Sequence, residues 1–534
     1  MNQAEIKRRQ AHAAAGLLAF GILIGAAQLT GYNGITYVAA ALEVCGLLFA
    51  LASGGTAEAL GKLLRIRNSK GQYRNAAGMS RNALLFQSAL GVAGTAAALV
   101  FAGEIAEKVF RIQYSASILM ILAPAIFLRS VSETLAGCCR GAGAELPGAI
   151  AVFLRQLLLL GFGLLFCRRL GDYGSKVSHL LAQENFASMY SGVGIAMAFT
   201  LSEFIVVLFL ALLLARVRRS GEKNLQDGRR MTASFGDSIM TLWNSRGAQA
   251  GIQLLLLLAL PLGLILFGRA AEDSDRMAAD YGVYFAGYGG VCGILTGTVI
   301  FLLIPVCGKA LQLMRREEHR FARTALQSGL HIGVVHAAFY AAFLAVMAEQ
   351  VGAAFCGEQA VLAAKMLRGG SLIIVFAALG YYFSRIMLLT GKKALVLGAA
   401  ALGTLLFAGF SAVFLNVGRA GVLSLVYGGL IGGGVSCIAL GMVLCRQFRL
   451  RVDWLQTLAV PAGLACVVGF VGMLLGRVFT PHLGNPVTSL VCFVLMAALY
   501  WIGLLLLRNF REQELELIPG GKAINALGQM LGVL

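Results

Sequence analysis

Residues 44–64 read VCGLLFALASGGTAEALGKLL, and residues 291–311 read VCGILTGTVIFLLIPVCGKAL. Both stretches begin with Val-Cys-Gly and reach Gly-Lys after an apolar run, and the two copies stand 247 positions apart. The correspondence continues at an offset of 248, where Tyr73 corresponds to Phe321 and Gly143 corresponds to Gly391. The chain therefore contains two copies of one arrangement. A ligand path between two duplicated lobes is typical of transporters.

The composition indicates a polytopic membrane protein. Of the 534 residues 58% are hydrophobic and 13% are charged, and the mean hydropathy is +0.79. This is more apolar surface than a soluble core of the same length buries. The apolar runs lack the alternation of barrel strands, so they predict helices. Windows of about 18 to 25 apolar residues cross the hydrocarbon as helix, and about fourteen occur, at 12–32, 35–58, 83–103, 114–139, 146–167, 189–215, 247–268, 281–306, 326–348, 360–388, 394–416, 420–445, 455–477 and 486–507.

The distribution of lysine and arginine supports this count independently. With a cytoplasmic N-terminus, the segments on the inner side hold 29 of these residues and the outer segments hold nine. Because basic residues resist translocation, we expect both termini in the cytoplasm. Most of the +19 net charge then lies at the inner face, where anionic lipid attracts it, so we expect no nucleic-acid partner. The eleven cysteines lack metal-type spacing, and we expect neither a metal nor another cofactor.

The repeat predicts four regions. Each copy has an even number of spans, so the two lobes are expected to be parallel repeats with a central cavity between them. A kink is expected in the seventh span at Pro261, which lacks an amide donor. The regions are an N-terminal six-helix lobe at 1–220, a basic cytoplasmic linker at 221–245, a second six-helix lobe at 246–447, and two additional spans with an amphipathic cytoplasmic tail at 448–534.

Three stretches resemble a known family. GGTAEALGKLLRIRNSKGQYRNAAGMSRNAL (54–84) is similar to the loop between the second and third helices of the multidrug/oligosaccharidyl-lipid/polysaccharide (MOP) exporter superfamily. LAGCCRGAGAELPGAI (135–150) is similar to its turn between the fourth and fifth helices. REQELELIPGGKAINALGQMLGVL (511–534) resembles the closing segment of the stage V sporulation protein B-like and polysaccharide flippase branch.

This resemblance implies a V of two six-helix bundles that alternates between inward-open and outward-open states in a bacterial cytoplasmic membrane. It implies a polyprenyl-diphosphate-linked sugar or a related cell-envelope precursor as the substrate, moved to the outer leaflet. The two additional spans would form a groove for the polyprenyl tail, and cell-envelope polymer synthesis enzymes would be partners. The first span lacks the arginine cluster of the best-known lipid II flippases, which argues against peptidoglycan precursor as the specific substrate.

Several basic residues fall inside predicted spans, where an ionised group costs about 2.5 to 3.5 kcal/mol and needs a partner or a wet cavity. Guanidinium groups supply both the charge and the forked donors that a diphosphate requires. Arg155 in the fifth span and Arg368 in the tenth, one in each lobe, are the preferred substrate ligands. Arg129 and Lys365 complete the expected pathway.

Three acidic residues also lie within spans, and they leave two interpretations open. Glu43, Glu133 and Glu203 are candidates for ion coupling or for ion pairing. In the first interpretation Glu43 and Glu203 titrate during transport. In the second, Glu203 or Glu133 pairs with Arg155 and holds helices together, and Glu133 neutralises Arg129, which stands four residues before it on one helix face.

The function that follows is a flippase of a lipid-linked oligosaccharide or related precursor that works by alternating access. The alternative within transport is a cation-coupled multidrug exporter. Connecting loops of at most about 30 residues leave no room for a catalytic domain, so we expect no enzymatic activity. A membrane scaffold without transport activity remains a further alternative. The sequence leaves the oligomeric state open, with a monomer plausible.

Overall fold

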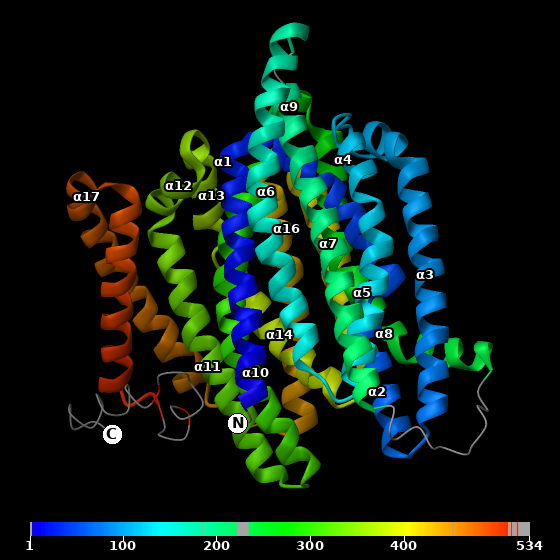
Figure 1. Ribbon diagram of the computed structural model, residues 1–534. Helices are drawn as coiled ribbons and strands as arrows, with labels where there is room; N and C mark the ends of the chain where they lie inside the picture. Colours follow the sequence, from blue (N-terminus) through cyan, green and yellow to red (C-terminus); the bar gives the residue numbers. More distant parts are fainter. Residues whose placement is uncertain are drawn as a thin grey trace. The chain divides into compact units, whose positions relative to one another are not determined.

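The computed structural model describes residues 3–183, 185–221, 234–450 and 452–510, together with Glu514 and Gly521. All regular elements in these residues are helical, which confirms the predicted all-α class (Figure 1). Residues 222–233 of the predicted linker and most of the predicted tail lie outside the described residues. The chain divides into two compact units, Met1–Phe285 and Ala286–Leu534.

Unit 1 is a bundle of long apolar helices. Its helices α6 and α7 pack along their lengths, and α5 packs against both α3 and α7. Ser234 caps α8 reciprocally with Asp237, which satisfies amide groups that a helix start leaves unpaired. The elements are α1 Gln3–Ser53, α2 Thr56–Ser69, α3 Tyr73–Glu104, the π-helical turn η1 Ile105–Phe110, α4 Ser115–Leu122, α5 Pro124–Gly141, α6 Leu146–Leu181, α7 Asn185–Gly221, α8 Phe235–Ala270 and α9 Ser274–Gly282.

Unit 2 follows the π-helical turn η3 Val283–Tyr288, which crosses the unit boundary. Its helices α15 and α16 form a closely packed pair, and α11 packs against α10, α14 and α17. The elements are α10 Gly289–Arg315, α11 His319–Val346, α12 Ala348–Cys356, the short 3₁₀ turn η4 Gly357–Gln359, α13 Ala360–Gly370, α14 Ile373–Leu389, α15 Lys393–Asn416, α16 Leu423–Phe448, the π-helical turn η5 Leu455–Ala459 and α17 Val460–Leu506.

The number of membrane spans agrees with the sequence. Among the described residues, eleven helices are long and apolar enough to cross a membrane, or twelve when the bent pair Ala348–Gly370 and Ile373–Leu389 counts as one more. Two of the eleven, Gln10–Ser69 and Leu455–Leu506, contain 60 and 52 residues. At about 1.5 Å per residue either is long enough to cross about 30 Å of hydrocarbon twice. Each holds a glycine outside helical geometry, Gly31 at φ 70° and Gly484 at φ 72°. Counting each as two spans gives fourteen.

The duplication seen in the sequence recurs in local structure. Gly143 and Gly391 both end a helix in the left-handed region, at φ 87° and 83°. In both turns the amide of the next residue bonds back to a carbonyl in the last helical turn, from Ala144 to Cys139 and from Lys392 to Met387. The fourth and tenth predicted spans are also interrupted at equivalent places, between α4 and α5 and between α13 and α14. The compact units nevertheless divide after 285, because α8 and α9 pack against α1.

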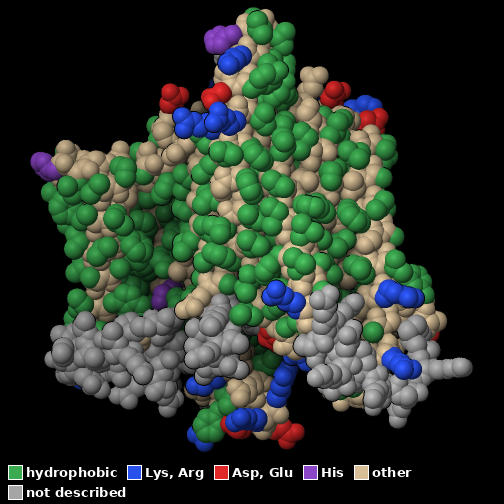
Figure 2. All heavy atoms as spheres, in the orientation of Figure 1, with side chains coloured by type: hydrophobic (Ala, Val, Ile, Leu, Met, Phe, Trp, Pro, Cys, Tyr) green, Lys and Arg blue, Asp and Glu red, His purple; other side chains and the backbone are tan. Residues whose placement is uncertain are grey.

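The surface matches a membrane setting. Figure 2 shows hydrophobic side chains over most of the height of the helices on the visible face, with lysine and arginine mainly towards the helix ends. Many large apolar side chains are accordingly exposed, among them Leu405, Leu212 and Val100 at 71%, 68% and 73%. A contiguous apolar surface of this kind is stable only against lipid. The chain is therefore a multi-pass membrane protein.

Candidate functional site

Four of the predicted charged residues meet inside unit 1, where α5, α6 and α7 pack together (Figure 1). Nε of Arg155 lies 2.7 Å from Oε1 of Glu203. Nη1 of Arg129 lies 2.9 Å from the same oxygen, and Nε of Arg129 lies 3.4 Å from Oε1 of Glu133. We call these four residues the ionic network.

The members of the ionic network differ in accessibility. The side chain of Glu203 is fully buried and that of Arg155 is 7% exposed, whereas Arg129 and Glu133 are each 28% exposed. An incoming ligand would therefore meet Arg129 and Glu133 first. The two positive and two negative formal charges cancel, which limits the cost of holding them in a low-dielectric bundle. Oε2 of Glu203 remains buried without a hydrogen-bond partner among the described residues.

Glu43 lies apart from the ionic network, in the second half of α1. The hydroxyl of Tyr281 on α9 lies 2.6 Å from Oε1 of Glu43 and 3.3 Å from the carbonyl oxygen of Leu260 on α8. A tyrosine has one hydroxyl proton, so an ionised Glu43 and the carbonyl compete for it. A protonated Glu43 instead donates to the tyrosine oxygen, and the tyrosine donates to Leu260, so that both contacts are satisfied. The arrangement can therefore accept a proton without moving a helix.

The remaining predicted residues, Arg368 and Lys365, lie in unit 2 on the short helix α13. Nη2 of Arg368 lies 2.9 Å from Oε1 of Glu349 on α12, and their side chains are 57% and 69% exposed. Lys365 is also exposed. Glu349 directly follows the predicted span 326–348, outside the hydrocarbon, so the sequence analysis did not pair it with Arg368.

Arg246 was absent from the predicted site, although it is one of the most buried side chains of the described residues, at 1% exposure. From α8 its guanidinium donates to the carbonyl oxygens of Ala52 and Leu51 at 2.7 and 3.1 Å, and it reaches the hydroxyl of Thr56 at 3.4 Å. The ring of Trp243, one turn earlier on α8, lies 4.8 Å from its central carbon. Arg246 thus binds the carboxyl end of α1, where backbone carbonyls lack helical partners.

Other contacts extend the junction of α8 with α1 and α2. Nε2 of Gln249 donates to Glu58 at 2.9 Å. The chain between α1 and α2 approaches α8 closely at Gly54, where a Cβ would lie 2.9 Å from Oε1 of Gln253. Because α8 belongs to the second copy of the sequence repeat and α1 to the first, this junction joins the two copies within unit 1. In the sequence, this junction was indicated only by Arg246, which follows Trp243 by three residues and directly precedes the predicted span 247–268.

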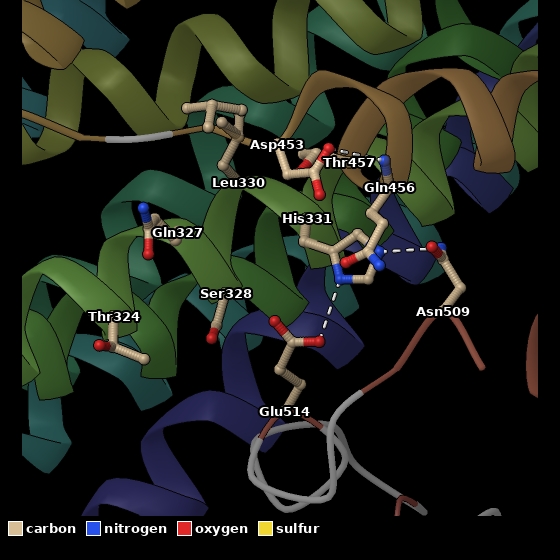
Figure 3. A pocket seen from close by; sticks show the side chains of 11 residues that line it. Thr324, Gln327, Ser328, Leu330, His331, Asp453, Gln456, Thr457, Asn509 and Glu514 are labelled. Atoms are coloured by element: carbon tan, nitrogen blue, oxygen red, sulfur yellow. Dashed lines mark hydrogen bonds and ion pairs between the residues drawn. The ribbon is translucent and has the colours of Figure 1, made fainter.

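Unit 2 contains a small polar cavity of about 70 Å³ beside α11 (Figure 3). His331 forms its centre, with Nδ1 3.0 Å from Oε2 of Glu514 and Nε2 3.0 Å from Nδ2 of Asn509. Phe510 stacks on the imidazole at a centroid distance of 5.0 Å. The cavity has room for about two waters, which is too little for a lipid-linked sugar. Its contacts instead fix the chain after α17 to α11.

No protein-family model matches this chain, and no curated protein matches it. Among the described residues, no three histidine, cysteine or acidic side chains are placed to hold a metal ion. Solved structures do match. The chain is similar to the lipid II flippase MurJ in an inward closed conformation, with a TM-score of 0.64 at 12% identity over 93% of this chain and 98% of that one.

It is also similar to an inward-facing multidrug resistance MATE family transporter of the MOP superfamily, with a TM-score of 0.62 at 17% identity over 82% of this chain and 94% of that one. A MOP superfamily transporter from Pyrococcus furiosus matches with a TM-score of 0.50 at 18% identity, over 84% of this chain and 93% of that one. These likenesses show the fold: the chain has the architecture of MOP superfamily transporters, as the sequence resemblance implied. Membership of the superfamily, and of a branch within it, stays a prediction.

Proposed function

We propose that this chain, with its MOP transporter fold, is a flippase that moves a lipid-linked oligosaccharide or related cell-envelope precursor across the membrane by alternating access. The observation that carries the proposal is the extent of the match. The flippase structure covers 93% of the chain and the MATE structure 82%. The additional share left by this MATE structure is about 60 residues, and the chain carries in α17 two spans that lie outside the repeat. A groove for a lipid tail would need such an addition.

In this proposal the ionic network supplies the recognition of the phosphate. Arg129 is its accessible cation and already touches two carboxylates, so a diphosphate would compete with Glu133 for the guanidinium rather than meet an empty charge. Guanidinium–phosphate pairs are bidentate and strong, which favours the exchange. Arg155, buried against Glu203, would hold Glu203 in place and thereby orient Arg129. Arg368 and Lys365 would bind the anion at a separate step.

Alternating access would use the junction formed by α8 and α9 on α1. Thr36, near the start of the second half of α1, donates to the carbonyl oxygen of Ala278 on α9. Arg246 binds the opposite end of the same half-helix, at Leu51 and Ala52. The two contacts are about 24 Å apart along the helix, so opening towards one side of the membrane requires the release of one of them. Bending at Pro261 within α8 would allow this.

The alternative is a cation-coupled multidrug exporter, and the pair formed by Glu43 and Tyr281 favours it, because this pair can take up a proton inside the membrane. The same pair would equally allow proton coupling in a flippase. The setting would in either case be a bacterial cytoplasmic membrane with both termini in the cytoplasm, and cell-envelope polymer synthesis enzymes would be partners of a flippase. A monomer contains every residue that the mechanism requires.

The test is outer-leaflet appearance of a fluorescent polyprenyl-diphosphate sugar in reconstituted vesicles. We expect Arg129→Gln to lower the rate at least tenfold, because one guanidinium–phosphate interaction is worth about 1.5 to 3 kcal/mol. The matched control Arg169→Gln removes an equal charge from an exposed position on α6 and should leave the rate unchanged. The alternative would be favoured if vesicles with the wild-type protein exported a cationic drug in exchange for protons moving the other way and did not move the polyprenyl substrate to the outer leaflet.

A further inference from the structure

An apolar hollow lies on unit 1, between α3, α5 and α7. It is a groove of about 470 Å³, within the range of sites that bind drug-sized molecules. Its walls are α3 and α7, and α5, which packs against both, forms the floor. Small side chains line both walls, with Ala77 on α3 and with Ala211 and Ala215 on α7, and they leave the groove open.

The floor of the groove belongs to the packed interior. Leu135 and Cys138 on α5 line it and are 7% and 6% exposed, and they join the hydrophobic cluster that also contains Met79 and Leu210. The groove is therefore a fixed feature of three packed helices rather than a gap between loose segments. Its lining is almost wholly apolar, so in a membrane it will be filled by a hydrocarbon chain rather than by water.

One charge interrupts this lining. Arg81 is the only charged side chain among the described residues that line the groove. It is exposed, and no hydrogen bond or ion pair joins it to another described residue. It follows the start of α3 by eight residues, or about 12 Å, so its long side chain can reach from the groove to the level of the lipid headgroups. Arg216, directly after Ala215 on α7, is exposed at the same end.

We propose that this groove binds one acyl chain of an anionic phospholipid, with the phosphodiester on Arg81. A phosphodiester carries one negative charge at neutral pH and matches one guanidinium, whereas a diphosphate carries more charge than Arg81 balances. The predicted orientation places this end of α3 in the cytoplasmic leaflet, where anionic lipids attract basic residues. The site is independent of the transported substrate, since it needs neither Arg129 nor the second lobe.

The experiment uses the full chain, purified in detergent and mixed with phosphatidylglycerol, phosphatidylcholine or a polyprenyl diphosphate, with bound lipid counted by native mass spectrometry. We expect wild type to retain phosphatidylglycerol in preference to phosphatidylcholine. Arg81→Gln should weaken phosphatidylglycerol binding about fivefold, because a basic residue near anionic lipid is worth about 1 kcal/mol. Arg169→Gln, the matched loss of one exposed charge from another part of unit 1, should bind as wild type does.

A second variant tests the groove rather than the charge. Ala211→Phe places a ring in the gap from an exposed position on α7 and should remove phosphatidylglycerol while the protein keeps its melting temperature. Equal retention of phosphatidylglycerol by wild type and Arg81→Gln would overturn the proposal, as would equal retention of the two phospholipids by wild type. Stronger Arg81-dependent retention of the polyprenyl diphosphate would assign the groove to the substrate and overturn the assignment to phospholipid.

Discussion

Arg246 provides the sharpest test of how unit 1 is held together. Replacing it with alanine removes two hydrogen bonds to the carbonyl oxygens of Ala52 and Leu51 and the contact with the ring of Trp243. Hydrogen bonds from a charged donor contribute about 1.5 to 3 kcal/mol each. Part of this is offset because the variant no longer buries a guanidinium, which itself costs several kcal/mol. A net loss of about 3 kcal/mol in the free energy of unfolding is therefore expected.

This loss converts to a measurable shift in melting temperature. A domain of 150 to 250 residues melts about 2 to 4 °C lower for each kcal/mol lost. Unit 1 is slightly longer than this range, so we expect Arg246→Ala to melt about 6 °C below wild type. Nine of the eleven cysteines are buried, so a thiol-reactive dye added to detergent-purified protein reports the melting directly.

Two further variants separate the contacts of Arg246 from its charge. Arg269→Ala removes one charge from an exposed position on the same helix and should melt within about 1 °C of wild type. Arg246→Lys keeps the charge but cannot span two carbonyls with one planar group, so its melting temperature should fall between those of wild type and Arg246→Ala. Equal melting temperatures for Arg246→Ala and Arg269→Ala would show that the guanidinium does not hold α8 to α1.

Three other expectations concern single positions. Glu317 occupies the left-handed region at φ 62°, which costs a residue with a side chain about 1 to 2 kcal/mol, so Glu317→Gly should raise the melting temperature by about 2 °C. Gly282→Ala would place a methyl group against the backbone of α1 and should lower the melting temperature. The methyl group of the control Gly293→Ala would extend into open space, so this variant should keep the melting temperature of wild type. Glu43→Gln keeps an acceptor for Tyr281 and should leave melting unchanged while removing any stimulation of transport by an imposed proton gradient.

The sequence predicted the features that repeat or that depend on local spacing. Gly143 and Gly391 could be matched because the duplication preserved their offset, and both end a helix in the same conformation. Arg129 and Glu133 could be placed together because residues four apart share a helix face. Both arguments use only the period of a helix and the order of the chain.

Contacts between helices required more than spacing. The partner of Arg155 depends on how α5, α6 and α7 are rotated about their axes, and apolar runs without a polar face do not encode that rotation. The sequence consequently left Glu203 and Glu133 as open alternatives for Arg155, and in the structure Glu203 lies 2.7 Å from it. The sequence analysis did not predict the buried contacts of Arg246 for a related reason, because a basic residue at the start of a span normally lies at the membrane interface.

The sharing of Glu203 by two arginines changes what the ionic network can do. If Arg155 bound the substrate, the anion would have to enter a site that is 7% exposed and displace a fully buried carboxylate, which would then depend on Arg129 alone for its compensation. If Arg129 binds the substrate, Arg155 continues to neutralise Glu203 and the displaced carboxylate is the partly exposed Glu133. The second route keeps the buried pair of Arg155 and Glu203 intact and displaces only a carboxylate that is partly exposed. Arg155→Lys keeps the charge beside Glu203, whereas Arg129→Lys loses the planar group that meets the phosphate. Arg155→Lys should therefore retain a higher transport rate than Arg129→Lys. The reverse order of rates would place the substrate on Arg155.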